Sequence, residues 1–283
     1  MEINKIGVLG AGTMGSGIAQ VAAEAGFAVI MRDLEDSFVH RGMTGIYKNL
    51  GRSADKGKIS KEEVEKVVGR ISGTTSLEDL SEVDLVIEAV VEDMNVKRDL
   101  YGELDRICPQ HAILASNTSG LSISEMAAAT GKPGKVIGMH FFNPAPVMKL
   151  VEVTKGALTS DETFQLIMDL SRRLGKDPIA VNEAPLFVVN RILIPMINEA
   201  AFVLMEGVAS AEDIDKGMML GANHPMGPLA LADLVGIDVL LLIQDTLYEE
   251  TGDSKYRACP LIRKMVRAGH LGRKSGRGFY QYD

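Results

Sequence analysis

Short apolar runs alternate with longer stretches of helical spacing over the first part of the chain. The apolar runs have the length of buried parallel strands and occur at Ile6–Leu9, Ala28–Met31, Leu85–Glu88, Ile113–Ala115 and Val136–Met139. One helical stretch between them is Ser60–Val68, in which Ser60 and Glu63 form a capping box. Another is Asn95–Ile107, which Pro109 ends. Strands separated by helices predict right-handed βαβ units, and therefore a doubly wound parallel sheet.

The pattern changes from about Asp177. Three segments with helical spacing follow, without strand-like alternation between them: Leu186–Met205, Asp213–Leu220 and Leu229–Tyr248. We therefore expect a smaller all-helical domain after the sheet. The best boundary lies in 182–185, which divides the chain into domains of residues 1–184 and 185–283.

Length and composition fit a globular protein with one large domain or two domains of moderate size. The chain has 283 residues, of which 46% are hydrophobic, and this excludes a disordered or collagen-like chain. The net charge is -8 with one short basic stretch near Lys56, so we expect no broad nucleic-acid binding. The apolar runs are too short for a membrane span. The first apolar run, Ile3–Val8, is soon followed by Gly10 and is too short for the apolar region of a signal peptide, so we expect none. We expect a cytoplasmic protein.

The cysteines and most histidines form no metal-ligand pattern. Cys108 and Cys259 are the two cysteines, so neither a disulfide framework nor a CxxC zinc motif is present, and we expect no metal site. We interpret four histidines as structural or solvated because they lie in no ligand spacing: His40, His111, His224 and His270.

A glycine-rich motif directly follows the first predicted strand. It reads Gly10-Ala11-Gly12-Thr13-Met14-Gly15 and opens a helix of small residues that Gly26 can end. In a G-x-G-x-x-G turn the first glycine allows the tight turn, the second lets the backbone approach a pyrophosphate, and the third lets helix and strand pack closely. The positive end of the helix then faces the phosphates. The motif therefore predicts a dinucleotide-binding, Rossmann-type domain.

Asp33 supports this prediction and bears on the choice of cofactor. It follows the second predicted strand, where a carboxylate can accept hydrogen bonds from ribose hydroxyls. A carboxylate there repels a 2′-phosphate, so NAD is favoured over NADP, although the neighbouring Arg32 offsets part of this effect. The alternative is a solvated aspartate beside an ordinary tight turn.

Three later segments carry candidate chemistry. Ser116–Ser119 follows a predicted strand and so lies at the carboxyl edge of the sheet, where ligands bind in such folds. His140 ends another strand, and Glu152 lies inside the apolar run Leu150–Val153. A strand, a turn and a returning strand bring Glu152 beside His140, and a carboxylate that fixes an imidazole tautomer suits acid–base catalysis.

Each of these residues also has a structural interpretation. A single histidine at a strand end is commonly structural, and Ser119 can simply cap the helix that follows. Glu152 requires some partner, because an unpaired buried carboxylate is costly.

Together these residues resemble the short-chain 3-hydroxyacyl-CoA dehydrogenases, and most closely the bacterial 3-hydroxybutyryl-CoA branch of butyrate and fatty acid metabolism. The resemblance extends along nearly the whole chain. It rests on segments 7–15, 114–119, 139–152, 188–191, 223–229 and 272–280.

The resemblance implies an NAD-dependent dehydrogenase acting on an acyl-CoA substrate. His140 would be the general acid and base, and Glu152 would orient it. Ser119 and Asn190 would hydrogen-bond the C3 oxygen of the substrate, in a cleft between the two domains. Glu92, Lys97, Asn143, Lys274 and Ser119 match family positions that contact NAD. Asn49, Lys56 and Ser119 match positions that contact CoA.

The chain departs from the family pattern at two positions. The family usually has glycine where this chain has Leu186, before Phe187. Gly120 replaces a larger residue that often follows the serine. We expect Leu186 to alter the approach to the helix carrying Asn190, and Gly120 to loosen the loop beside Ser119.

Two alternatives remain open at this stage. The first is a β-hydroxyacid dehydrogenase, which acts on a free acid and shares the glycine-rich start. Members of that group resemble each other in using a lysine as the acid and base on the helix between the domains, whereas residues 186–207 of this chain contain no lysine. A non-catalytic, crystallin-like relative would keep the fold alone. The long apolar stretches of the helical domain, with the family resemblance, predict a homodimer, or a larger assembly of such dimers, through residues 186–283. The alternative is that the first domain covers these apolar helix faces within one chain.

Overall fold

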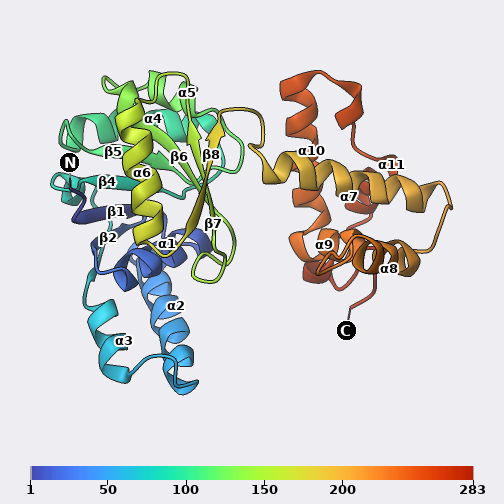
Figure 1. Cartoon of the computed structure of the whole chain (residues 1–283), viewed down its shortest axis with the longest axis horizontal. Coiled ribbons are helices and arrows are strands. Elements are labelled where there is room, and N and C mark those ends of the chain that lie inside the picture. The colour runs from blue at the N-terminus through green and yellow to red at the C-terminus, as the bar shows by residue number, and fades with distance from the viewer. Residues whose placement is uncertain (1, 283) are drawn as a thin grey trace. The chain divides into compact units, whose positions relative to one another are not determined.

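The chain divides into two compact units. The computed structural model describes residues 2–282, and we call its two parts unit 1 (Met1–Phe187) and unit 2 (Val188–Asp283) (Figure 1). Unit 1 extends past the boundary expected after Ala184, because the side chains of Leu186 and Phe187 are buried among residues of unit 1.

Unit 1 is built on an eight-stranded sheet in the order β3-β2-β1-β4-β5-β6-β7-β8. The strands are β1 (Lys5–Leu9), β2 (Ala28–Arg32), β3 (Ile71–Thr74), β4 (Leu85–Glu88), β5 (Ile113–Ser116), β6 (Val136–Phe141), β7 (Leu150–Lys155) and β8 (Asp177–Asn182). Neighbouring strands are parallel except β6 and β7. The mostly parallel sheet confirms the predicted fold class. The pattern of apolar residues missed β3, whose centre is Ser72-Gly73, and β8, which is largely exposed.

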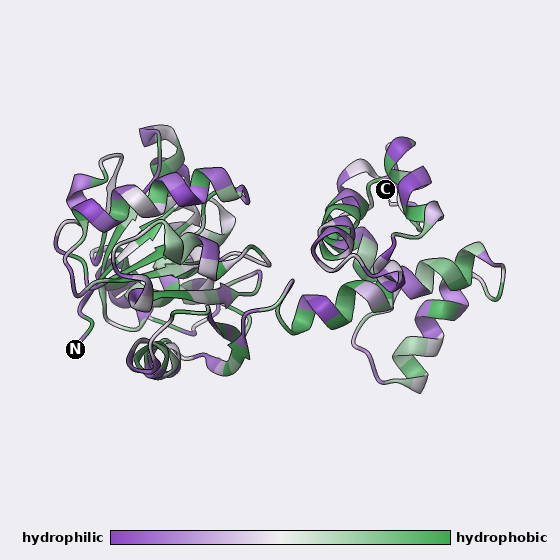
Figure 2. Ribbon diagram, turned by 90° about the horizontal axis from the view of Figure 1, so that it is seen from above, coloured by the Kyte–Doolittle hydropathy of each residue, from purple (hydrophilic) through white to green (hydrophobic). Residues whose placement is uncertain are grey.

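Helices cover the sheet of unit 1. They are α1 (Thr13–Glu24), α2 (Asp36–Asp55), α3 (Lys61–Val68), α4 (Met94–Ile107), α5 (Ile123–Ala128) and α6 (Asp161–Arg173), with 3-10 turns at Glu78–Leu80 and Pro133–Lys135. The Ser60 hydroxyl accepts a hydrogen bond from the Glu63 backbone N–H at 3.1 Å, which confirms the predicted cap of α3. The strands of the sheet are largely hydrophobic (Figure 2). Their apolar residues form two separate buried clusters, one containing Ile6 and Val8 and the other Val86 and Leu114.

Unit 2 is helical, as predicted. Its helices are α7 (Val189–Met205), α8 (Ala211–Gly221), α9 (Pro228–Val235), α10 (Ile237–Thr251) and α11 (Pro260–Arg267), with 3-10 turns at Ser254–Tyr256 and Arg273–Ser275. The single helix expected over Leu229–Tyr248 is wrong, because Gly236 adopts a φ of 104° and separates α9 from α10. Within residues 2–282, no helix is both long enough and apolar enough to cross a bilayer.

Candidate functional site

The glycine loop between β1 and α1 has the backbone geometry that its sequence predicts. Gly10 has a φ of 92°, and a Cβ atom added there would lie 2.5 Å from the Ala89 carbonyl oxygen. A Cβ at Gly15 would lie 1.8 Å from the Gly10 carbonyl oxygen, so this glycine lets α1 pack directly on the loop. A Cβ at Gly12 would meet nothing within 4 Å. Gly10 and Gly15 are therefore required by the fold, whereas Gly12 keeps the loop backbone open to a ligand.

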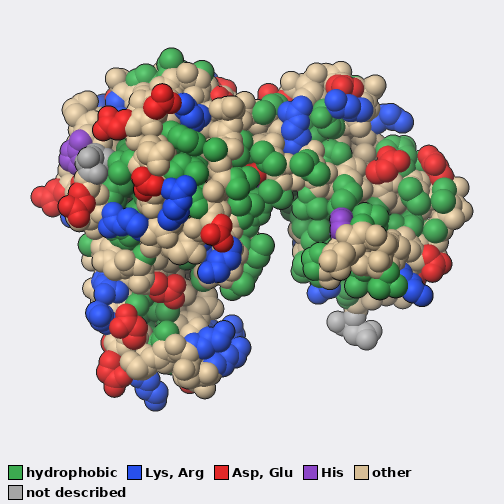
Figure 3. Space-filling view, viewed as in Figure 1, with side chains coloured by type: hydrophobic (Ala, Val, Ile, Leu, Met, Phe, Trp, Pro, Cys, Tyr) green, Lys and Arg blue, Asp and Glu red, His purple; other side chains and the backbone are tan. Residues whose placement is uncertain are grey.

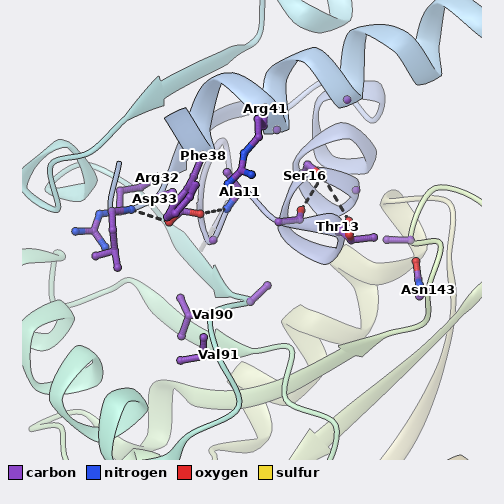
Figure 4. Close-up of a pocket in the computed structure, with 18 of the residues that line it drawn as sticks. Ala11, Thr13, Ser16, Arg32, Asp33, Phe38, Arg41, Val90, Val91 and Asn143 are labelled. Atoms are coloured by element: carbon purple, nitrogen blue, oxygen red, sulfur yellow. Dashed lines mark hydrogen bonds between the residues drawn. The ribbon is translucent and has the colours of Figure 1, made fainter. Parts of the chain in front are cut away.

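A cavity of about 970 Å³ lies over this loop (Figure 4). It is lined by the loop residues Gly10–Thr13, by Asp33 after β2, by one face of α2, and by Val90 and Val91 after β4. Met14 packs against the core instead. The N-terminus of α1 opens beside the cavity with free backbone N–H groups for an anion. Loop, helix end and cavity together fit a dinucleotide such as NAD.

Asp33 holds the loop in place from the end of β2. Its Oδ2 accepts a hydrogen bond from the Ala11 N–H at 2.7 Å, and its Oδ1 accepts one from the Leu34 N–H at 2.7 Å (Figure 4). The neighbouring Arg32 Nε donates to the Thr75 carbonyl oxygen at 3.0 Å. Asp33 thus presents a carboxylate to the cavity, while one donor of Arg32 is already engaged by the backbone.

A buried ion-pair network joins β4, α4 and the loop after β5. Lys97 is 1% exposed, and its Nζ lies 2.5 Å from Glu88 Oε1 and 3.3 Å from Glu92 Oε2. Glu92 Oε1 accepts hydrogen bonds from the Thr118 hydroxyl at 2.5 Å and from the Ser119 N–H at 2.9 Å. The network therefore ties Glu92 and Lys97, both expected to contact NAD, to the loop that carries Ser119.

Glu88 is a buried member of this network for which the sequence predicted no role. Glu88 is fully buried and accepts a hydrogen bond from the Ser116 hydroxyl at 2.7 Å. Burial, followed by the charge of Glu88, raises the pKa of Tyr101 well above its usual value. A carboxylate ending an apolar strand was the available signal, since such a group requires a partner.

His140 and Glu152 are paired across the antiparallel strands β6 and β7. The two residues are in direct register, and His140 Nδ1 lies 2.7 Å from Glu152 Oε2. Glu152 is fully buried and His140 is 5% exposed. The imidazole also packs against the rings of Phe142 and Phe187, with centroids 4.5 and 5.9 Å away. When Nδ1 donates its proton to the carboxylate, Nε2 is left to accept or donate a proton.

The remaining predicted residues lie in different parts of the chain. Asn143 and Asn49 line the cavity over the glycine loop. Lys56 is exposed at the C-terminal end of α2, where Lys and Arg side chains gather near α3 (Figure 3).

Asn190 lies in the first turn of α7 in unit 2. Lys274 also belongs to unit 2, where its Nζ donates to Asp238 Oδ2 at 2.7 Å. Among the described residues, no His, Cys, Asp and Glu side chains cluster as metal ligands.

Comparisons with known proteins identify relatives along the whole chain. Residues 5–184 match the family model of the 3-hydroxyacyl-CoA dehydrogenase NAD binding domain, and residues 187–282 match that of the C-terminal domain. The chain is 56% identical over 283 residues to a probable 3-hydroxybutyryl-CoA dehydrogenase of Bacillus subtilis, covering 100% of this chain and 99% of that protein. It is 53% identical over 279 residues to the 3-hydroxybutyryl-CoA dehydrogenase of Clostridioides difficile, covering 99% of each. The crystal structure of (S)-3-hydroxybutyryl-CoA dehydrogenase from Ralstonia eutropha is similar with a TM-score of 0.98, at 50% identity and full coverage of both chains.

Proposed function

The chain belongs to the 3-hydroxyacyl-CoA dehydrogenase family, and on this premise we propose that it interconverts acetoacetyl-CoA and 3-hydroxybutyryl-CoA with NAD(H). The His140–Glu152 pair carries the proposal, because a buried carboxylate hydrogen-bonded to one imidazole nitrogen prepares the other for proton transfer. When bound, NAD(H) supplies or accepts the hydride.

His140 is the general acid and base of the proposed reaction. In the reducing direction the Nε2–H group of His140 protonates the alkoxide that forms at C3 of the substrate. In the oxidising direction Nε2 removes the proton of the C3 hydroxyl. Glu152 keeps the imidazole in the Nδ1–H tautomer and stabilises the imidazolium when it forms. Ser119 and Asn190 hydrogen-bond the C3 oxygen, a role that rests on the family resemblance.

The proposal assigns the two ligands to different residues of the chain. NAD binds over the glycine loop, with Asp33 toward its ribose and Asn143 lining the same cavity. Glu92, Lys97 and Lys274 are assigned to NAD by resemblance. Lys56 is assigned to a CoA phosphate, and its exposure among basic side chains supports this (Figure 3).

Steady-state rates with acetoacetyl-CoA and NADH test the proposal. We expect turnover by the wild-type protein, and none when a free 3-keto acid replaces the thioester. Turnover of the free acid alone would favour a β-hydroxyacid dehydrogenase. Absence of turnover in a folded, NADH-binding sample would indicate a non-catalytic relative and overturn the proposal.

The proposed assembly is a homodimer formed through unit 2. Large apolar side chains are exposed on several of its helices, among them Ile192, Leu220 and Leu242. Exposed apolar side chains on a domain this small suggest a contact surface, and twofold pairing is its commonest form. We also propose that the protein is located in the cytoplasm.

A further inference from the structure

The loop that carries Gly120 packs closely against Leu186. A Cβ atom added at position 120 would lie 2.5 Å from Leu186 Cδ2, 3.3 Å from its Cα and 3.4 Å from its N. The 2.5 Å contact requires the end of the Leu186 side chain to move, and the 3.3 Å approach to its Cα is tight. The Leu186 side chain thus occupies the space that a side chain at position 120 would need.

The backbone at Leu186 has a conformation that favours glycine. Leu186 has a φ of 61° and Phe187 a φ of 56°, so two successive residues with side chains adopt the left-handed region. That region favours glycine, because a Cβ crowds the backbone there. Leu186 is 3% exposed, and burying its side chain opposes the backbone cost. A leucine is therefore tolerated here as long as its side chain has the space beside Gly120.

The contact joins two loops that reach proposed catalytic residues. On one side, Gly120 follows Ser119, and the Thr118 hydroxyl accepts hydrogen bonds from the N–H groups of Gly120 at 3.3 Å and Leu121 at 2.9 Å. On the other side, Leu186 precedes Phe187, whose buried ring packs against the imidazole of His140. A change in the bulk between the two loops is thus transmitted to Ser119 and to the His140 ring.

We infer that Gly120 and Leu186 form a complementary pair of positioning residues, in which the Leu186 side chain fills the space that the absent side chain at position 120 leaves open. The pair holds the Ser119 loop and the Phe187 ring at the separation that the reaction requires. This inference rests on the proposed function, since Ser119 and His140 are the residues that it positions.

A double-mutant cycle tests the pair with three variants: Gly120→Ala, Leu186→Gly, and both together. The first introduces a clash, and the second removes strain but leaves a void beside the Ser119 loop. We expect each single variant to lower kcat/KM for acetoacetyl-CoA by about tenfold, and the double variant to lie within about threefold of wild type. Gly51→Ala is the matched control, because a Cβ at Gly51 in α2 meets nothing within 4 Å.

Rates are measured well below the Tm of each variant, together with the NADH Kd and the pH profile of kcat. The inference predicts an unchanged NADH Kd and altered pH profiles in the single variants, restored in the double variant. The inference would be overturned if the two substitutions were coupled in their effects on Tm but not in their effects on kcat/KM. It would also be overturned if the losses of kcat/KM in the two single variants simply multiplied in the double variant. Loss of the proposed function is distinguishable, because the wild-type protein would then show no turnover at all.

Discussion

His140 and Glu152 lie directly opposite each other on β6 and β7, with Nδ1 and Oε2 2.7 Å apart and both residues buried. The antiparallel register aligns the two residues, and their side chains share one face of the sheet because opposite residues of neighbouring strands do. Glu152 is a buried carboxylate, and its pairing with the imidazole offsets part of the free-energy cost of burying its charge.

We expect His140→Ala to reduce kcat by roughly 10²–10⁴-fold, the usual contribution of a positioned acid–base group. NADH affinity should change little, because His140 is absent from the lining of the cavity over the glycine loop. Glu152→Gln should lower kcat in the same direction while retaining a side chain of equal size. Steady-state kinetics and NADH titration measure both effects. A loss smaller than tenfold for His140→Ala would assign the proton transfer to another residue.

Replacement of Asp33 tests the cofactor preference. Asp33→Ala removes the acceptor of the Ala11 and Leu34 N–H groups and should weaken NADH binding. Asp33→Asn keeps one acceptor oxygen and removes the charge that repels a 2′-phosphate. We therefore expect Asp33→Asn to narrow the preference for NADH over NADPH with the smaller loss of NADH affinity. A wild-type protein that already prefers NADPH would contradict this interpretation.

The glycine loop offers two substitutions with opposite expected effects. Gly15→Ala places a Cβ 1.8 Å from the Gly10 carbonyl oxygen, so it should destabilise the fold by about 1–3 kcal/mol. Gly12→Ala meets no protein atom within 4 Å and should leave Tm nearly unchanged while raising the NADH Kd. Thermal unfolding and NADH titration of the two variants separate these effects. Unchanged NADH affinity in Gly12→Ala would place the pyrophosphate elsewhere.

Lys56→Ala should raise the KM for acetoacetyl-CoA without changing kcat, because one contact to a CoA phosphate is lost. The effect should diminish as salt is added, since an exposed ion pair is screened within about 10 Å at 0.1 M ionic strength. Lys66→Ala, another exposed lysine on the neighbouring helix α3, is the matched control. Equal KM values for Lys56→Ala and Lys66→Ala at low salt would remove Lys56 from the CoA site.

Light scattering at micromolar concentration tests the proposed dimer. We expect a particle of twice the 30.5 kDa chain mass. Placing charges on the apolar surface of unit 2, as in the double variant Leu220→Glu/Leu242→Glu, should favour the monomer. Leu158→Glu, at an exposed leucine of unit 1, should not. A wild-type particle of 30.5 kDa would sink the proposal.

Features encoded by neighbouring residues were readable from the sequence. The strand–glycine loop–helix unit was predictable because Gly10, Gly12 and Gly15 each have a local backbone role, and two of these roles are visible as forbidden Cβ positions. The cap of α3 was predictable for the same reason, since Ser60 and Glu63 lie within one turn. The returning strand that carries Glu152 followed from its apolar surroundings.

Features that depend on contacts between distant segments required the tertiary structure. Lys97 and Glu88 carry no local pattern that predicts a buried pair, because burial depends on which helix covers the end of β4. Gly120 and Leu186 were separate anomalies in the sequence, 66 positions apart (186 − 120 = 66), and became one feature only when folding placed their atoms in contact. The sequence alone determined the elements and the chemical groups that they carry, because these depend on local backbone preferences and apolar periodicity. Which groups meet was decided by packing, since side chains far apart along the chain compete for the same space only in the folded protein.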